Sequence, residues 1–254
     1  MEALFYQMIF KRKSFHLFKE TMPISETELQ AIENMYQKCK PLVSDIKTEM
    51  KIVPADQTTC KRGQEYCILF YSEKRDRYLQ NIGYIGEQLD LYLASLGIGT
   101  LWFGIGKTEK PVPEGMDFVI MIAIAKVAED KFRKDMFKSK RKPLQEIWVG
   151  EPLPEVGDIV RFAPSACNTQ PWLVEYSKGK LEVFRYKKPG KRGIMPAHKV
   201  IYYNQIDMGI FLLFLELCLT HQKIPFERTL YTDSQEANAE NTLAAVYQLG
   251  FINA

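Results

Sequence analysis

"RFAPSACNTQPWLVEY", residues 161–176, places a polar loop between an apolar segment typical of a helix end and an apolar segment typical of a strand. Turn chemistry accounts for Pro164, Ser165 and Asn168, because proline fixes φ and short polar side chains bond their own backbone. It does not account for Trp172 directly after them. An indole there suggests a group that covers a flat, polar-edged partner; the alternative is a rigid turn with the tryptophan in the core.

The bulk composition indicates a soluble globular protein that binds a small molecule. With 254 residues and 46% hydrophobic content, the chain can bury a full core without disulfides. A formal net charge of +3 is too mild for a nucleic-acid or membrane-surface protein, which concentrates basic charge on one face. We therefore expect a small-molecule partner, with no nucleic acid and no membrane.

Cysteine usage and the N-terminus indicate the cytoplasm. The five cysteines are an odd count with no CxxC pair and no metal-ligand spacing, so we expect reduced thiols, with Cys167 a packing residue, and no metal site. The N-terminus carries its acid before a short apolar run and its bases after it, the reverse of a secretory signal. The apolar stretch 208–219 is shorter than a bilayer requires and contains Glu216, so we expect a buried helix.

Hydrophobic periodicity predicts a mixture of helices and strands. Segments rich in β-branched and aromatic residues predict strands at 66–71, 100–105, 118–125, 172–176, 181–186, 225–231 and 243–249. Helical spacing predicts helices over 25–39, 81–97, 153–163 and 205–219. Ser25 is expected to cap the first of these helices, and Gly97 to end the second.

The two halves of the chain resemble each other in the order of their elements. A shift of 124 places Ile82 on Ile206 and the strand 118–125 on 242–249. This predicts an internal duplication; the alternative is that any two buried helices followed by strands align in this way.

The predicted duplication divides the chain into two intertwined α+β halves, residues 1–148 and 149–254. Such a chain forms internally the twofold arrangement that a homodimer makes from two copies, so we expect a monomer that acts as a pseudo-dimer. Ligand sites are then expected between the halves.

Three segments carry a resemblance to the FMN-dependent nitroreductase family. "APSACNTQPW" (163–172) resembles the family's signature loop, "KRKSFHLF" (11–18) resembles its N-terminal Arg-x-Ser-x-basic arm, and "LYLASLGIGTLWFG" (91–104) is similar to its turn beside the flavin. The internal repeat resembles the tandem variety of the family. The resemblance implies a nitroreductase-like α+β fold in which one chain stands for the usual dimer.

The resemblance also implies a set of FMN-binding residues from four parts of the chain. They are Arg12, Lys13, Ser14 and His16 of the arm, Trp102, Phe103 and Gly104 of the turn, Lys140 and Arg141 as the family's C-terminal basic pair, and Ala163, Pro164, Ser165, Asn168 and Gln170 of the signature loop.

The arm is suited to a phosphate. Arg12 can form a bidentate charge-assisted pair with phosphate oxygens, and Ser14 adds a hydroxyl. His16 stands where the family pattern has Arg or Lys, so phosphate binding at that position is expected to weaken above about pH 6.5. The alternative reading of the arm is a solvated basic helix face, and that of the basic run 131–143 is a solvated linker.

Gly104 is the candidate for tuning the flavin. A backbone N–H aimed at ring atom N5 acts there without a catalytic side chain, and a residue without Cβ lets the backbone approach the ring. The alternative is an ordinary strand glycine.

The halves differ in what they retain. Half two lacks an Arg-x-Ser arm, and half one has Lys40, Pro41 and Leu42 opposite the signature-loop residues of half two. One flavin site per chain is expected, built from both halves.

The resemblance implies an enzyme that oxidises NADH or NADPH and reduces a nitroaromatic, quinone or related acceptor in a ping-pong cycle through flavin N5. Two alternatives remain open: a relative with another redox task, such as dehydrogenation or dehalogenation, and a non-catalytic flavin carrier or sensor.

Overall fold

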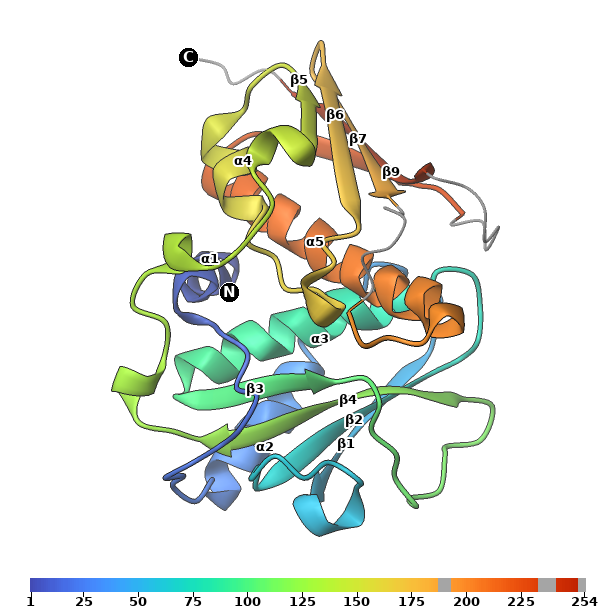
Figure 1. Cartoon of the computed structure of the whole chain (residues 1–254). Coiled ribbons are helices and arrows are strands. Elements are labelled where there is room, and N and C mark those ends of the chain that lie inside the picture. Colours follow the sequence, from blue (N-terminus) through green and yellow to red (C-terminus); the bar gives the residue numbers. More distant parts are fainter. Residues whose placement is uncertain (187–192, 233–240, 251–254) are drawn as a thin grey trace.

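The structure, a computed structural model, describes residues 1–186, 193–232 and 241–250. Two β-sheets form the two ends of an α+β molecule, and two long helices cross between them (Figure 1). The first sheet has the order β1-β2-β4-β3, with strands β1 (Thr48–Pro54), β2 (Tyr66–Ser72), β3 (Ile98–Phe103) and β4 (Asp117–Lys126). The second has the order β5-β6-β7-β9-β8, with strands β5 (Trp148–Gly150), β6 (Trp172–Ser177), β7 (Lys180–Tyr186), β8 (Phe226–Leu230) and β9 (Asn241–Leu249).

Most predicted elements are confirmed. The helices are α1 (Glu2–Lys11), α2 (Glu26–Tyr36), α3 (Tyr78–Ser95), α4 (Pro154–Val160) and α5 (Val200–His221). Ser25 caps α2 as predicted: its Oγ accepts from the Glu28 N–H, and the Glu28 carboxylate accepts from the Ser25 N–H. Gly97 follows α3 with φ +74°, the left-handed conformation that glycine tolerates at a helix end.

The sequence patterns did not predict α1, β1 or β5. Strand β1 pairs antiparallel with β2 at the edge of its sheet, and most of its residues are only half-buried. The three residues of β5 pair in parallel with β6, so the second sheet is mixed. The predicted boundary after residue 148 falls inside β5.

Helix α5 is the core of the molecule. With the preceding turn it runs over Ala197–His221, long and apolar enough by composition to cross a membrane, but 83% of its most apolar window is buried inside the fold. Burial therefore identifies α5 as a core helix, which is longer than the apolar stretch 208–219 indicated.

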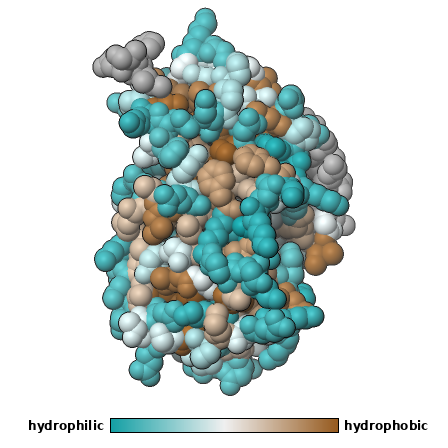
Figure 2. Space-filling view, turned by 90° about the vertical axis from the view of Figure 1, so that its left-hand side faces the viewer, coloured by the Kyte–Doolittle hydropathy of each residue, from teal (hydrophilic) through white to brown (hydrophobic). Residues whose placement is uncertain are grey.

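On one face of the surface, apolar side chains gather near the middle and hydrophilic ones cover most of the rest (Figure 2).

Helices α3 and α5 cross at two glycines. A Cβ on Gly83 would overlap the carbonyl oxygen of Ile206, and a Cβ on Gly209 would overlap that of Gln80. The two contacts are equivalent under the repeat, because Ile206 lies 126 positions after Gln80 and Gly209 lies 126 positions after Gly83.

The two halves repeat one arrangement. The order β1-β2-β4-β3 around α3 recurs as β6-β7-β9-β8 around α5, and both central pairings shift register, between Phe70 and Tyr71 in one sheet and between Val183 and Phe184 in the other. This repetition supports the proposed duplication. The two contacts of the helix crossing correspond at a shift of 126 residues, so 126 replaces the predicted shift of 124. The shift of 124 came from matching leucines between the two helices.

Candidate functional site

A cavity of about 260 Å³ lies between the two halves. Half one lines it with the arm, the turn after β3, Arg62 and Ile120; half two lines it with the signature loop, residues 194–196 and α5. The three segments singled out in the sequence thus meet at one place. The predicted residues in its wall are Arg12, Ser14, His16, Trp102, Phe103, Gly104, Pro164 and Ser165.

The arm is tied to the fold by a buried carboxylate. Arg12 is only 3% exposed, and its Nε donates to Asp90 Oδ2 at 2.9 Å. The same carboxylate accepts from Thr100 Oγ1 at 2.6 Å and from Trp102 Nε1 at 2.9 Å. Asp90 therefore occupies one edge of the Arg12 guanidinium, which leaves the other edge for the predicted phosphate contact.

A second buried acid lies beside this pair. Glu87 is fully buried, with Oε1 3.8 Å from Arg12 Nε. Burial, and then the negative charge of Asp90, raise the pKa of Glu87 well above its usual value. We take Glu87 as the neutral member, and Asp90 is the acid that bonds Arg12 directly.

Additional arginines gather next to Arg12. Burial, followed by the charge of Arg12, lowers the pKa of Arg133 to about 10. Burial lowers the pKa of Arg141 to about 10 as well, with further contributions from Arg133, Arg12 and Arg161. Arginines gathered closely enough to lower the pKa of a neighbour make a candidate site for an anion. We call Arg12, Arg133, Arg141 and Arg161 the arginine cluster.

The basic residues of the arginine cluster differ in part from those predicted to bind the cofactor. Arg133 lies in the basic run 131–143 but was not singled out there. Lys13 and Lys140 do not line the cavity: Lys13 Nζ lies 4.7 Å from the centre of the Phe15 ring, and Lys140 lines a neighbouring open hollow together with Arg141.

The signature loop is a strained turn held by hydrogen bonds. Cys167, Asn168 and Gln170 have φ between +50° and +55°, which costs free energy in residues other than glycine. The Ala166 N–H donates to Asp207 Oδ1 at 2.9 Å, and the Gln170 N–H donates to Ser165 Oγ at 2.9 Å. These contacts present Pro164 and Ser165 to the cavity.

The strained turn directs other signature-loop residues away from the cavity. Asn168 Oδ1 accepts from Arg141 Nη1 at 2.9 Å, and its Nδ2 donates to the Lys140 carbonyl. Gln170 Oε1 accepts from the Lys142 N–H at 2.8 Å. Ala163 is fully buried and outside the wall. These three residues shape the loop and do not line the cavity, and their direct contact with the cofactor stays a prediction.

Two further expectations for the signature loop are corrected. Trp172 is fully buried and stacks on Phe211, with ring centroids 4.7 Å apart, so it fills the core and covers no ligand. Cys167, expected to pack inside, is exposed on the loop and lines the cavity.

Gly104 packs closely against α5. The Tyr203 hydroxyl donates to the Gly104 carbonyl at 2.7 Å, and a Cβ on Gly104 would lie 2.5 Å from the Tyr203 ring. The close approach that Gly104 permits is thus to a tyrosine of half two, which corrects the expectation of an approach to the flavin alone. Strand β3 ends at Phe103, so Gly104 lies in the turn.

Besides Arg133, the sequence patterns missed Asp90, Asp207, Arg62 and Tyr203. Asp90 and Asp207 carried a signal, because both are acids within predicted buried helices. Arg62 and Tyr203 carried none, because only the fold brings them to the cavity wall.

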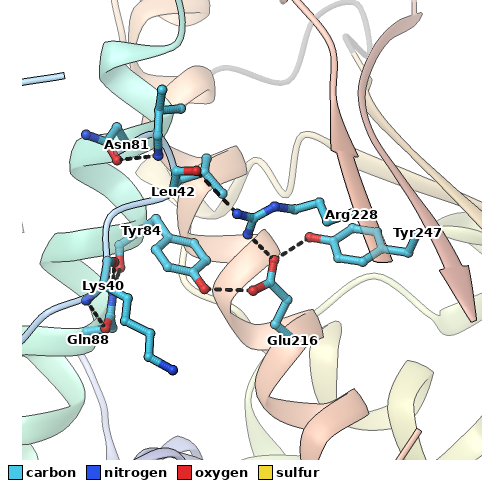
Figure 3. Close-up of polar contacts among 9 residues, drawn as sticks. Lys40, Leu42, Asn81, Tyr84, Gln88, Glu216, Arg228 and Tyr247 are labelled. Carbon is cyan, nitrogen blue, oxygen red and sulfur yellow. Dashed lines mark hydrogen bonds and ion pairs between the residues drawn. The ribbon is translucent and has the colours of Figure 1, made fainter. Parts of the chain in front are cut away.

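At the position related to the cavity by the repeat, polar side chains bond one another. Glu216 and Arg228 lie 126 positions after Asp90 and Trp102. Glu216 accepts from the hydroxyls of Tyr84 and Tyr247, each at 2.7 Å, and pairs with Arg228, which also donates to the Leu42 carbonyl (Figure 3).

Tyr84 and Glu216 of this network also line a hollow of about 430 Å³. The lysine in its wall, Lys40, pairs with Glu2 at 2.8 Å. Within residues 1–186, 193–232 and 241–250, no group of three or more His, Cys, Asp or Glu side chains could hold a metal ion.

Comparisons with known proteins agree with this arrangement. The family model described as "Putative TM nitroreductase" matches residues 5–219. A Thermotoga maritima protein described as a "putative nitroreductase" is 21% identical, with a TM-score of 0.65, over 96% of this chain and 93% of its own. No curated protein matches this chain.

Two FMN-bound structures are more distantly similar. A nitroreductase from Desulfovibrio desulfuricans, also described as "putative", is 20% identical with a TM-score of 0.43, over 59% of this chain and 98% of its own. A nitroreductase from Desulfitobacterium hafniense is 16% identical with a TM-score of 0.41, over 55% and 98%.

Proposed function

Because the chain belongs to the TM nitroreductase family, we propose that it is an FMN-dependent oxidoreductase that oxidises NADH or NADPH and reduces a small organic acceptor such as a nitroaromatic or a quinone. The observation that carries this proposal is the cavity between the halves, whose wall joins aromatic and apolar side chains to Arg12, with Arg133 and Arg141 near enough for the charge of Arg12 to lower their pKa values.

The residues of the cavity fit the chemistry of FMN. A phosphate of FMN is dianionic, and the arginine cluster includes Arg133 and Arg141, whose pKa values are lowered by burial and by the neighbouring arginines. The ring system of FMN is flat and largely apolar, and the wall offers Trp102, Phe103 and Pro164.

Each part of the chain then has a defined task. When bound, FMN supplies the redox chemistry, since its ring accepts and releases hydride. The arginine cluster binds its phosphate, and Tyr203 fixes the Gly104 carbonyl and thereby the turn beside the ring. Asp207 and Ser165 hold the signature loop in the strained form that closes the cavity.

The same cavity would receive the nicotinamide and the acceptor in turn, which gives ping-pong kinetics. A relative with another redox task, or a flavin carrier without turnover, would use the same residues for binding. Turnover therefore separates these functions, and flavin binding alone does not.

We expect the FMN-loaded chain to lose its flavin absorbance when NADH or NADPH is added without oxygen, and to regain it when a quinone or nitroaromatic follows. Parallel double-reciprocal plots are expected, because each substrate leaves before the next enters. Free FMN at the same concentration is the control. If neither nicotinamide bleaches the bound flavin faster than free FMN, the chain is a carrier and the proposed activity is wrong.

We also propose one FMN per chain. The repeated position lacks a counterpart of the signature loop in half one, and Tyr84, Glu216, Arg228 and Tyr247 bond one another there (Figure 3).

A further inference from the structure

Asp207 is an acid buried in the apolar helix α5, at the wall of the cavity. It is 3% exposed. Its Oδ1 accepts from the Ala166 N–H at 2.9 Å, whereas Oδ2 has no hydrogen-bond partner among the residues that the structure describes. A buried polar atom without a partner is costly, so an unpaired oxygen at a cavity wall indicates a contact that a ligand completes.

The surroundings of Asp207 do not favour a carboxylate. The charged and titratable groups that share the cavity wall are Arg12, His16, Arg62, Cys167 and Tyr203.

None of these groups is a cause of the shift in Asp207: burial raises its pKa well above the usual value, and the Ala166 N–H only opposes this in part. On the neighbouring helices, Glu87 and Asp90 of α3 lie beside Arg12, and Glu155 and Asp158 of α4 are exposed.

The repeat supplies an internal comparison. Asn81 lies 126 positions before Asp207, and its Oδ1 accepts from the Val43 N–H at 3.0 Å (Figure 3). Asp207 Oδ1 accepts from the Ala166 N–H in the same way. Asn81 Nδ2, like Asp207 Oδ2, is buried without a hydrogen-bond partner among the described residues, but it carries protons and no charge. A protonated aspartate resembles this amide: one oxygen accepts from the loop, and the other atom carries a proton.

We propose that Asp207 keeps its proton in the folded protein and donates a hydrogen bond from Oδ2 to an acceptor atom of the molecule bound in the cavity. This inference rests on the proposed function, in which the first such molecule is FMN, whose ring carbonyl oxygens and ring nitrogens are acceptors. An ionised Asp207 would have no proton to donate to those atoms. FMN binding therefore weakens as Asp207 ionises.

The first test uses the flavin-free chain. The folded-state pKa of Asp207 lies above its unfolded value of about 3.9, so its contribution to stability is fully present below that pH and is lost as pH rises towards the folded-state pKa. Within that window, the folding equilibrium constant of the wild type falls by up to about tenfold per pH unit relative to Asp207→Asn. Denaturant unfolding of both chains at several pH values measures this difference.

The second test is FMN titration across the same pH range. Asp207→Asn keeps both hydrogen-bonding roles, so it binds FMN with nearly wild-type affinity at low pH and does not weaken as pH rises. Asp207→Ala removes the donor and the hold on Ala166, and we expect at least about tenfold weaker binding at every pH. Asn81→Ala, which removes the equivalent contact outside the cavity wall, is the matched control and leaves FMN affinity unchanged.

The outcomes separate this inference from the proposed function. If the stability difference between wild type and Asp207→Asn does not change with pH, Asp207 is ionised in the folded chain and the inference is overturned. Weaker FMN binding by Asp207→Asn at all pH values overturns it as well. If the wild type does not bind FMN at any pH, the proposed function fails, while the flavin-free measurement still decides whether Asp207 holds its proton.

Discussion

Gly209→Ala is expected to remove most of the stability of the fold. A Cβ at this position would overlap the carbonyl oxygen of Gln80 in the backbone of α3, and no side-chain rotation relieves a clash with backbone. The helices would have to separate along the crossing that joins the halves. Losses above about 4 kcal/mol are exceptional for single substitutions, and we expect this one among them, against a typical total of about 5–15 kcal/mol.

Denaturant unfolding followed by circular dichroism measures this loss. Gly83→Ala is expected to behave in the same way, because its Cβ would meet the Ile206 carbonyl. Gly157→Ala in α4 is the control, since its nearest neighbours are the Leu144 methyl groups at 3.1 and 3.3 Å, which can move. If Gly209→Ala unfolds at the same denaturant concentration as Gly157→Ala, the close crossing of α3 and α5 is not formed.

Removing two charges of the arginine cluster is expected to abolish tight FMN binding. A hydrogen bond to a charged group contributes about 1.5–3 kcal/mol, so Arg133→Met and Arg141→Met each weaken FMN binding by about tenfold or more. The double variant is expected to lose about 100-fold or more. Riboflavin, which lacks the phosphate, should bind wild type and variants about equally.

Two controls make this result specific. Lys134→Met removes an exposed charge from the same basic run and should leave FMN binding unchanged. The flavin-free variants should keep the circular dichroism of the folded wild type, because both arginines are only half-buried. Equal losses of FMN and riboflavin affinity would place the phosphate elsewhere.

Local sequence signals predicted the elements that depend on local chemistry. The reciprocal bonds of Ser25 and Glu28 fix the start of α2, and both residues lie within one turn. The apolar run of α5 predicted a buried helix because its burial is nearly complete around the axis. Strand β1 was missed because it is a half-buried edge strand that mixes charged and apolar residues.

The site was predicted to the level of segments rather than side chains. The motif placed Ser165 and Asn168 on one loop, but the positive φ values that turn Asn168 towards Arg141 depend on contacts with Asp207 and residues 140–142. Trp172 followed the loop in sequence and was assigned to a ligand, whereas the ring of Phe211 on α5 holds it in the core. Such directions follow from tertiary packing, which no short pattern contains.

The most direct test of the account is the number of FMN molecules that one chain binds. The flavin-free chain would be titrated with FMN, with bound flavin measured by absorbance and protein by amino-acid analysis. We predict saturation at one FMN per chain, since the arginine cluster lies at the cavity between the halves on the side of Arg12, whereas Glu216 and Arg228 pair with each other at the repeated position. Saturation at two per chain, or no binding at all, would contradict the account.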